Sequence, residues 1–90
     1  MRRIHAFISG RVQGVFYRWE TKELATKLAL KGFAKNLRDG RVEVVAEGEE
    51  EKLEELIKFL HKGPTYARVT KVEVKWETFK NEFDQFFIKY

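Results

Sequence analysis

Five segments of the chain have the residue pattern of β-strands that bury one face. They are Arg3–Ser9, Phe33–Arg38, Arg41–Glu47, Thr70–Glu77 and Asp84–Tyr90. The clearest is Thr70–Glu77, where apolar residues alternate with Lys and Glu, as in a strand that covers a core with one side only. In Arg3–Ser9 the second face carries His5 and Phe7 instead of charged residues. We therefore expect Arg3–Ser9 to be a central strand, ended by Gly10.

Two other segments repeat apolar residues with the period of an α-helix. In Trp19–Lys31 the apolar stripe is Thr21, Leu24, Ala25 and Leu28, and in the segment that opens with Glu49 it is Leu53, Leu56, Ile57 and Leu60. Acidic residues stand near both starts, where the helix dipole favours negative charge. We expect Gly32 to end the first helix in a left-handed conformation and Gly63-Pro64 to end the second.

The order of these elements predicts one α+β domain. Asp39-Gly40 lies between two strand-like runs, which is a strong signal for a β-hairpin. The order is then β-α-β-β-α-β with a further C-terminal strand, in which Phe86, Ile88 and Tyr90 share one side. Helices with one apolar stripe need a sheet to cover. Residues 1–90 are therefore predicted to form a single ferredoxin-like sandwich, an antiparallel sheet with two helices on one face.

The composition sets the broad class of the protein. The chain has 90 residues, 43% of them hydrophobic, and no cysteine, so disulfides and thiolate chemistry are excluded. No apolar run is long enough for a signal peptide or a membrane span, and a cytoplasmic protein without membrane partners is expected. Lys and Glu are abundant while Asn and Gln are scarce, a balance typical of hyperthermophiles.

The net charge of +4 suits anionic partners but does not identify one. Acidic and basic residues are interleaved, whereas a nucleic-acid footprint needs basic residues gathered on one face. Nucleic acid is therefore not an expected partner. The alternating carboxylates are interpreted as a solvated sheet face; they are Glu43, Glu47, Glu73 and Glu77.

The segment Gly10–Arg18, GRVQGVFYR, joins the first predicted strand to the first helix. Gly10 and Gly14 permit backbone conformations closed to other residues. The amides of residues 13 to 18 would precede the first helical turn without partners inside the helix. Such amides form a cradle for an anion, and Arg18 adds a planar set of donors that suits phosphate. A common glycine-rich turn with a solvated arginine is the alternative, and the residues alone leave it open.

GRVQGVFYR resembles the signature loop of the acylphosphatase family, V-Q-G-V-x-[FY]-R. A second block, Gly32–Glu43 (GFAKNLRDGRVE), is similar to the family's G-[WFY]-[VA]-[RK]-N-x-x-D-G-x-V-E segment, and Gly63-Pro64 and the closing FDQFFIKY also match. The resemblance spans nearly the whole chain in the right order. It departs where Phe33-Ala34 replaces the frequent Trp-Val and where Tyr17 replaces the frequent Phe.

The resemblance implies a metal-independent enzyme without cofactors that hydrolyses acyl phosphates to a carboxylate and inorganic phosphate, the latter also an inhibitor. It places the catalytic residues at Arg18 and Asn36. It assigns substrate phosphate binding to the loop residues Gln13, Gly14, Val15, Phe16, Tyr17 and Arg18. Without the motif, Asn36 would be interpreted as a strand residue bonded to backbone.

Several other residues are interpreted as structural. His5 and His61 do not have the spacing of a zinc site, Asp39 is a turn former, and Trp19 and Trp76 are expected to pack rather than to stack on bases. The crowded Phe83, Phe86 and Phe87 either close the edge of the core or face a partner. The alternative function is a non-catalytic ferredoxin-like module that binds anions or RNA.

Overall fold

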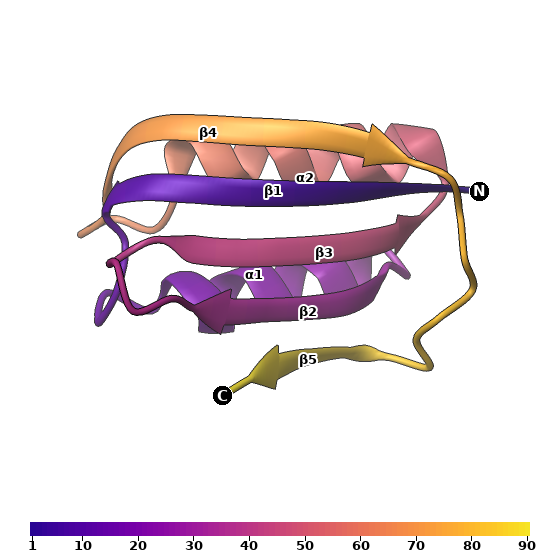
Figure 1. Ribbon diagram of the computed structural model, residues 1–90, viewed down its shortest axis with the longest axis horizontal. Helices are drawn as coiled ribbons and strands as arrows, with labels where there is room; N and C mark the ends of the chain where they lie inside the picture. The colour runs from indigo at the N-terminus through magenta and orange to yellow at the C-terminus, as the bar shows by residue number, and fades with distance from the viewer.

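The computed structural model describes all 90 residues, Met1–Tyr90, as a five-stranded sheet covered by two helices (Figure 1). In chain order the elements are β1 (Arg2–Arg11), α1 (Tyr17–Lys27), β2 (Lys31–Asn36), β3 (Val42–Gly48), α2 (Glu50–Lys62), β4 (Arg68–Glu77) and β5 (Phe86–Lys89). The strand order is β4-β1-β3-β2-β5, in which every pair is antiparallel except β2 and β5. The predicted fold class and the central place of the first strand are confirmed.

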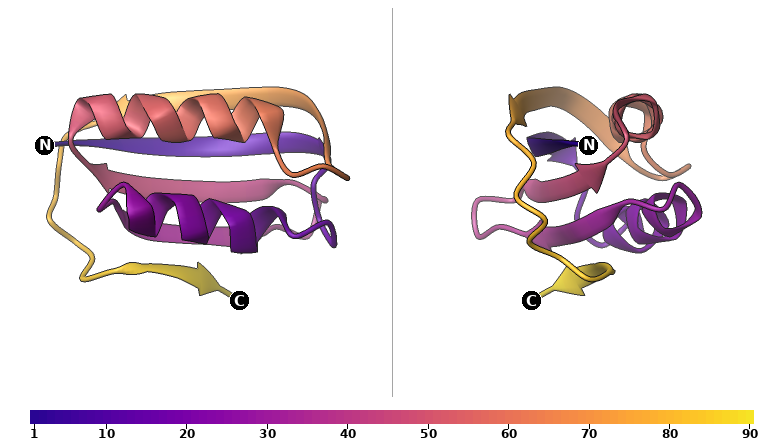
Figure 2. Two further views of the ribbon diagram at one scale, coloured as in Figure 1. Left: turned by 180° about the vertical axis from the view of Figure 1, so that it is seen from behind. Right: turned by 90° about the vertical axis from the view of Figure 1, so that its right-hand side faces the viewer.

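Both helices lie on the same face of the sheet (Figure 2). The alternation of the strands decides this face: Ile4, Ala6 and Ile8 of β1 are fully buried beneath the helices, while the residues between them are on the open face. From α2, the predicted stripe buries Leu53 and Leu60 completely. Neither helix is long and apolar enough to cross a membrane.

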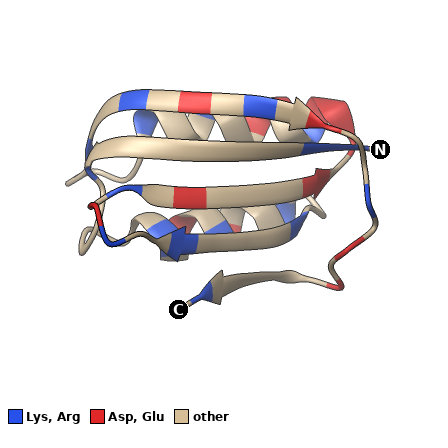
Figure 3. Cartoon of the chain, viewed as in Figure 1, with Lys and Arg blue, Asp and Glu red and all other residues tan.

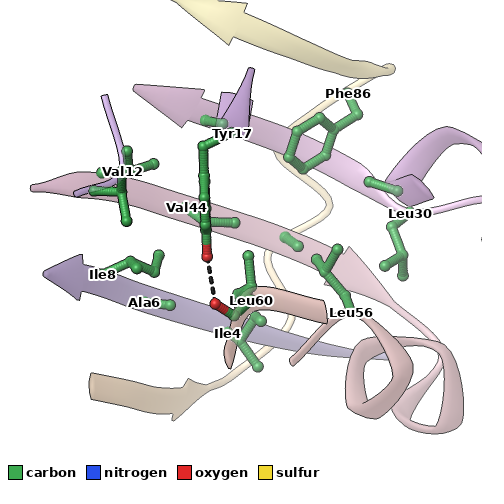
Figure 4. Packing of buried hydrophobic residues seen from close by; sticks show 14 of the residues in the cluster. Ile4, Ala6, Ile8, Val12, Tyr17, Leu30, Val44, Leu56, Leu60 and Phe86 are labelled. Carbon is green, nitrogen blue, oxygen red and sulfur yellow. Dashed lines mark hydrogen bonds between the residues drawn. The ribbon is translucent and has the colours of Figure 1, made fainter. Parts of the chain in front are cut away.

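Tyr17 joins the two helices through the core (Figure 4). Its side chain is 1% exposed, and its hydroxyl donates a hydrogen bond of 2.5 Å to the carbonyl oxygen of Leu60 near the end of α2. Burial raises the pKa of the Tyr17 hydroxyl. Tyr17 therefore adds a polar link between the two helices without leaving its hydroxyl unpaired.

Strand direction brings three distant segments to one end of the sheet. β1 and β2 each run antiparallel to β3, and β5 runs parallel to β2. The carboxyl ends of β1, β2 and β5 therefore lie at the same edge, with the β1–α1 loop beside them (Figure 1). This edge holds both residues predicted to be catalytic.

The ends of the first helix and strand differ from the prediction. α1 stops at Lys27, and Ala29 rather than Gly32 takes the left-handed conformation, with φ of 58°. Gly32 lies in β2, where a Cβ atom would collide with the carbonyl oxygen of Val45. This glycine is therefore required because β2 and β3 approach closely here. In the sequence, a glycine after a helical segment has the pattern of a helix stop. β1 also continues past Gly10 to Arg11 through a bulge.

The hairpin between β2 and β3 is present but has a longer connection than two residues. The Leu37 amide bonds to the Arg41 carbonyl at 2.8 Å, so five residues, 37–41, form the turn. The Asp39 carboxylate accepts a hydrogen bond of 3.1 Å from the Arg41 amide and one of 2.8 Å from the Arg41 side chain. These bonds lower the pKa of Asp39 and confirm that it is a turn former.

The open face is not the simple solvated surface that the alternating carboxylates predict. Charges of both signs follow one another along β4 (Figure 3), but Glu47 of β3 is only 3% exposed. It accepts hydrogen bonds from the Lys80 amide at 2.8 Å, the Glu82 amide at 3.0 Å and the Arg3 guanidinium at 3.2 Å. Arg3 also contacts Glu77 and Glu82. Glu47 is thus the anchor of the segment that crosses the sheet from β4 to β5.

The histidine and phenylalanines of this face are also accounted for. The His5 Nε2 atom lies 2.6 Å from a carboxylate oxygen of Glu43, so the structural interpretation of His5 agrees with the structure. Phe86 is buried in the core, whereas Phe33, Phe83 and Phe87 form a ring cluster with centroids 5.9–6.3 Å apart. The three rings pack on one another and close the edge beside β5.

We predict that Glu47→Gln lowers the free energy of unfolding by about 3 kcal/mol at neutral pH, because it leaves Arg3 and two amides facing an amide group. Burial alone would raise the pKa of Glu47, but bonds from the Glu82 and Lys80 amides and from Arg3 lower it below 4.5. The stabilisation is therefore present above that pH and is lost as the pH falls through the lower folded-state pKa. Denaturant unfolding between pH 7 and pH 2 measures both effects.

Glu73→Gln is the matched control, since Glu73 is exposed on the same face. It is expected to change the free energy of unfolding by less than about 0.5 kcal/mol. Equal stability of the two variants would contradict the anchoring role of Glu47.

Candidate active site

The loop from Val12 to Phe16 presents a row of free backbone amides. Gly14 and Phe16 both have left-handed backbone conformations, with φ of 74° and 67°, and Phe16 is the N-cap of α1. The first helical hydrogen bond runs from the Glu20 amide to the Phe16 carbonyl at 2.9 Å. No amide from Gln13 to Trp19 donates a hydrogen bond within the chain. These donors and the helix dipole make the loop a ready site for an anion.

Side chains that point away from the amides hold this loop in place. The Gln13 side-chain amide donates to the carbonyls of Leu37 at 2.7 Å and Arg41 at 3.0 Å. Val15 is 7% exposed within the core, as is Tyr17 at 1%. Gln13, Val15 and Tyr17 therefore fix the loop through their side chains, and only their backbones are available to a ligand.

A cavity of about 500 Å³ opens beside the loop. It joins residues from the loop, the start of α1, the end of β2 and the end of β5. The lining residues are Val12, Gly14, Phe16, Tyr17, Arg18, Trp19, Asn36, Ile88 and Tyr90. Arg18 and Asn36, which are 18 positions apart in sequence, thus face one space.

The positive charge of Arg18 has no carboxylate partner in the chain. Arg2, Arg3 and Arg41 form ion pairs, but Arg18 forms none. Its guanidinium instead makes a cation–π contact with Tyr90, whose ring centroid lies 5.2 Å from the guanidinium carbon. A cation–π contact leaves the guanidinium donors free, so Arg18 can still bind an anion in the cavity.

Asn36 is the last residue of β2, and its side-chain oxygen is buried without a hydrogen-bond partner. Asn36 is thus a strand residue, as that interpretation expects, but its side-chain oxygen makes no hydrogen bond to backbone. An unpaired buried acceptor is costly, by about 1–3 kcal/mol. This oxygen is closed to solvent, so the other atoms of Asn36 line the cavity.

Four lining residues were not predicted for the site: Val12, Trp19, Ile88 and Tyr90. Trp19 is not a packing residue, because it is 54% exposed at the cavity. Ile88 and Tyr90 enter the site only because β5 is parallel to β2, a pairing that alternation in the sequence does not reveal. The chain contains no group of three or more His, Cys, Asp or Glu side chains that could hold a metal ion.

Fold and cavity together define an α+β domain with free amides and an unpaired arginine beside a cavity at a strand–helix loop. The sequence profile of the acylphosphatase family matches residues 4–88. An acylphosphatase from Thermococcus kodakarensis is 55% identical over 75 residues, which cover 83% of this chain and 82% of that protein. The crystal structure of acylphosphatase from Bacillus subtilis superposes with a TM-score of 0.96 at 34% identity, over the full length of both chains.

The chain therefore belongs to the acylphosphatase family, and it is an enzyme that hydrolyses acyl phosphates. The relative from Thermococcus agrees with the hyperthermophile-like composition. A domain of the same fold also occurs within a larger protein. The full-length HypF structure matches 99% of this chain with a TM-score of 0.90 and 29% identity, but the match covers only 12% of HypF.

Proposed function

We propose that Arg18 and the free amides of the β1–α1 loop bind the phosphoryl group of an acyl phosphate, and that Asn36 orients the attacking water. The observation that carries this proposal is the shared cavity. It combines an arginine without a carboxylate partner and the Asn36 side chain with the loop whose amides are free. Four further cavities lack this combination of groups.

The chemistry needs little beyond positioning and charge. Water attacks phosphorus, the bond from phosphorus to the carboxylate oxygen breaks, and the electron pair leaves with the carboxylate. The products are a carboxylate, inorganic phosphate and a proton. The Arg18 guanidinium and the amides stabilise the charge on the equatorial phosphoryl oxygens.

Asn36 acts on the water rather than on the phosphate. Its amide is neutral and cannot serve as a strong base, but the side-chain amide can form a hydrogen bond with a water in the cavity. This fixes the water opposite the leaving carboxylate, and a phosphoryl oxygen of the substrate accepts the proton. A carboxylate is a good leaving group, so the scheme requires neither a general acid nor a metal ion.

The open face of the sheet does not favour RNA binding. Lys71, Glu73, Lys75 and Glu77 alternate in sign along β4 (Figure 3), and Phe33 packs against two neighbouring phenylalanines rather than standing free. Stacking on bases needs open aromatic surfaces on this face. The cytoplasmic location expected from the sequence stays a prediction.

We expect the chain to release inorganic phosphate from acetyl phosphate in excess EDTA, because the proposed site uses only protein groups. Inorganic phosphate should inhibit competitively, since it occupies the same amides and arginine. Phosphate release followed with and without chelator, at several phosphate concentrations, measures both. A requirement for added metal, or the absence of inhibition, would contradict the proposed site.

Arg18→Ala is expected to lower kcat/KM for acetyl phosphate at least about 10³-fold, as removal of a transition-state arginine does. The dissociation constant of inorganic phosphate, measured by calorimetry, should rise about 100-fold in the variant. In the wild-type enzyme this constant should equal the inhibition constant from kinetics. Arg38→Ala is the control, since Arg38 is exposed in the β2–β3 turn and does not line the cavity. Tight phosphate binding by Arg18→Ala would rule out the proposed role.

Asn36→Ala is expected to lower kcat about 10²- to 10³-fold, the loss typical of one positioned catalytic donor or acceptor. Phosphate should still bind with nearly wild-type affinity, because Arg18 and the amides remain. Steady-state kinetics and calorimetry separate the two effects. Gln85→Ala, which removes an exposed amide outside the cavity, should leave both unchanged, and normal turnover of Asn36→Ala would exclude water positioning.

A further inference from the structure

Three large aromatic residues are exposed around the mouth of the catalytic cavity. The large hydrophobic residues that the chain exposes are Met1, Phe16, Trp19, Tyr66 and Tyr90. Three of these line this one cavity: Phe16 at 69% exposed, Trp19 at 54% and Tyr90 at 91%. Isolated exposed apolar residues need no explanation, but a cluster at a binding site does.

The cavity is also larger than its proposed phosphate site requires. Inorganic phosphate has five non-hydrogen atoms, whereas a volume of about 500 Å³ lies in the range that holds drug-sized ligands. The polar groups lie at Arg18, Asn36 and the loop, and most of the other lining residues are apolar. Space therefore remains next to the phosphate for an apolar part of the substrate.

Phe16 occupies a backbone position that disfavours it. Its φ of 67° is the left-handed conformation that glycine or asparagine adopts with less strain. Its side chain is not held by the core, since it is mostly exposed. Strain kept without any return in packing points to a role at the site.

We infer that Phe16, Trp19 and Tyr90 form a subsite for the acyl group, and that the enzyme prefers acyl phosphates with an aromatic or bulky apolar acyl group. The inference rests on the proposed function and names its substrate class. Phe16 and Trp19 flank Arg18 along the chain, and Tyr90 contacts the Arg18 guanidinium. A phosphate bound at Arg18 therefore places the acyl group among these rings, which favour flat apolar partners.

The test compares 3-phenylpropanoyl phosphate with propanoyl phosphate. The phenyl ring is two carbons from the carboxyl group, so the two leaving carboxylates have similar basicity and differ mainly in apolar surface. The wild-type enzyme is expected to have a kcat/KM at least about tenfold higher for the phenyl substrate. Trp19→Ala should reduce this ratio about tenfold, chiefly through KM, while the inhibition constant of inorganic phosphate stays unchanged.

Tyr66→Ala is the matched control, because Tyr66 is an exposed aromatic residue away from the cavity, and its ratio should equal that of wild type. Phe16→Gly is the second variant; it removes a ring and also relieves the backbone, so folding is maintained while the ratio falls. A ratio that is the same in wild type, Trp19→Ala and Phe16→Gly would overturn the acyl subsite and leave acyl phosphate hydrolysis intact. Failure of the wild type to hydrolyse either substrate would overturn the proposed function itself.

Discussion

An uncompensated positive pole at the start of α1 is the feature on which the site depends. The amides from Gln13 to Trp19 have no acceptor, and Arg18 beside them has no carboxylate. The amide dipoles and the Arg18 guanidinium carry charge of the same sign and repel one another. The loop therefore keeps its conformation only through stabilising interactions elsewhere. Val15 and Tyr17 provide these in the core, and Gln13 in the β2–β3 turn. In the proposed site, the phosphoryl group of the substrate is the anion that pairs with these groups.

Arg3, unlike Arg18, has a positive charge that is paired with carboxylates of the chain. Its guanidinium is 9% exposed and contacts three carboxylates, Glu47, Glu77 and Glu82. Burial would lower the pKa of Arg3, but hydrogen bonds to these carboxylates raise it. The charge of Arg3 is thus neutralised within the chain and holds the segment before β5. The charge of Arg18 at the other end of the sheet has no carboxylate partner, so the structural ion cluster is separate from the proposed anion site.

Much of this arrangement is predictable because it follows from local rules. Alternation and helical spacing identify all seven elements, and the two glycines and arginine of GRVQGVFYR mark the loop. The errors come from tertiary contacts. Gly32 resembles a helix stop but is needed for close approach to Val45, and Glu47 resembles a solvated residue until residues 80–82 fold across it. The aromatic residues around the cavity could not be predicted either. Trp19 lies in a segment with a helical pattern, and the local sequence does not show which aromatic ring faces a cavity.

The fifth strand connects stability and catalysis. A four-stranded sandwich would place the loop and Asn36 at one end of the sheet. Without β5, however, the cavity would lack the side opposite them. The segment anchored on Glu47 crosses to the far side of β2, where parallel pairing turns the end of β5 toward the same edge. Ile88 and Tyr90 then complete the cavity, and Tyr90 reaches Arg18. The buried carboxylate at one end of the sheet therefore fixes the path of the chain that closes the site at the other, although no residue of the ion cluster lines the cavity.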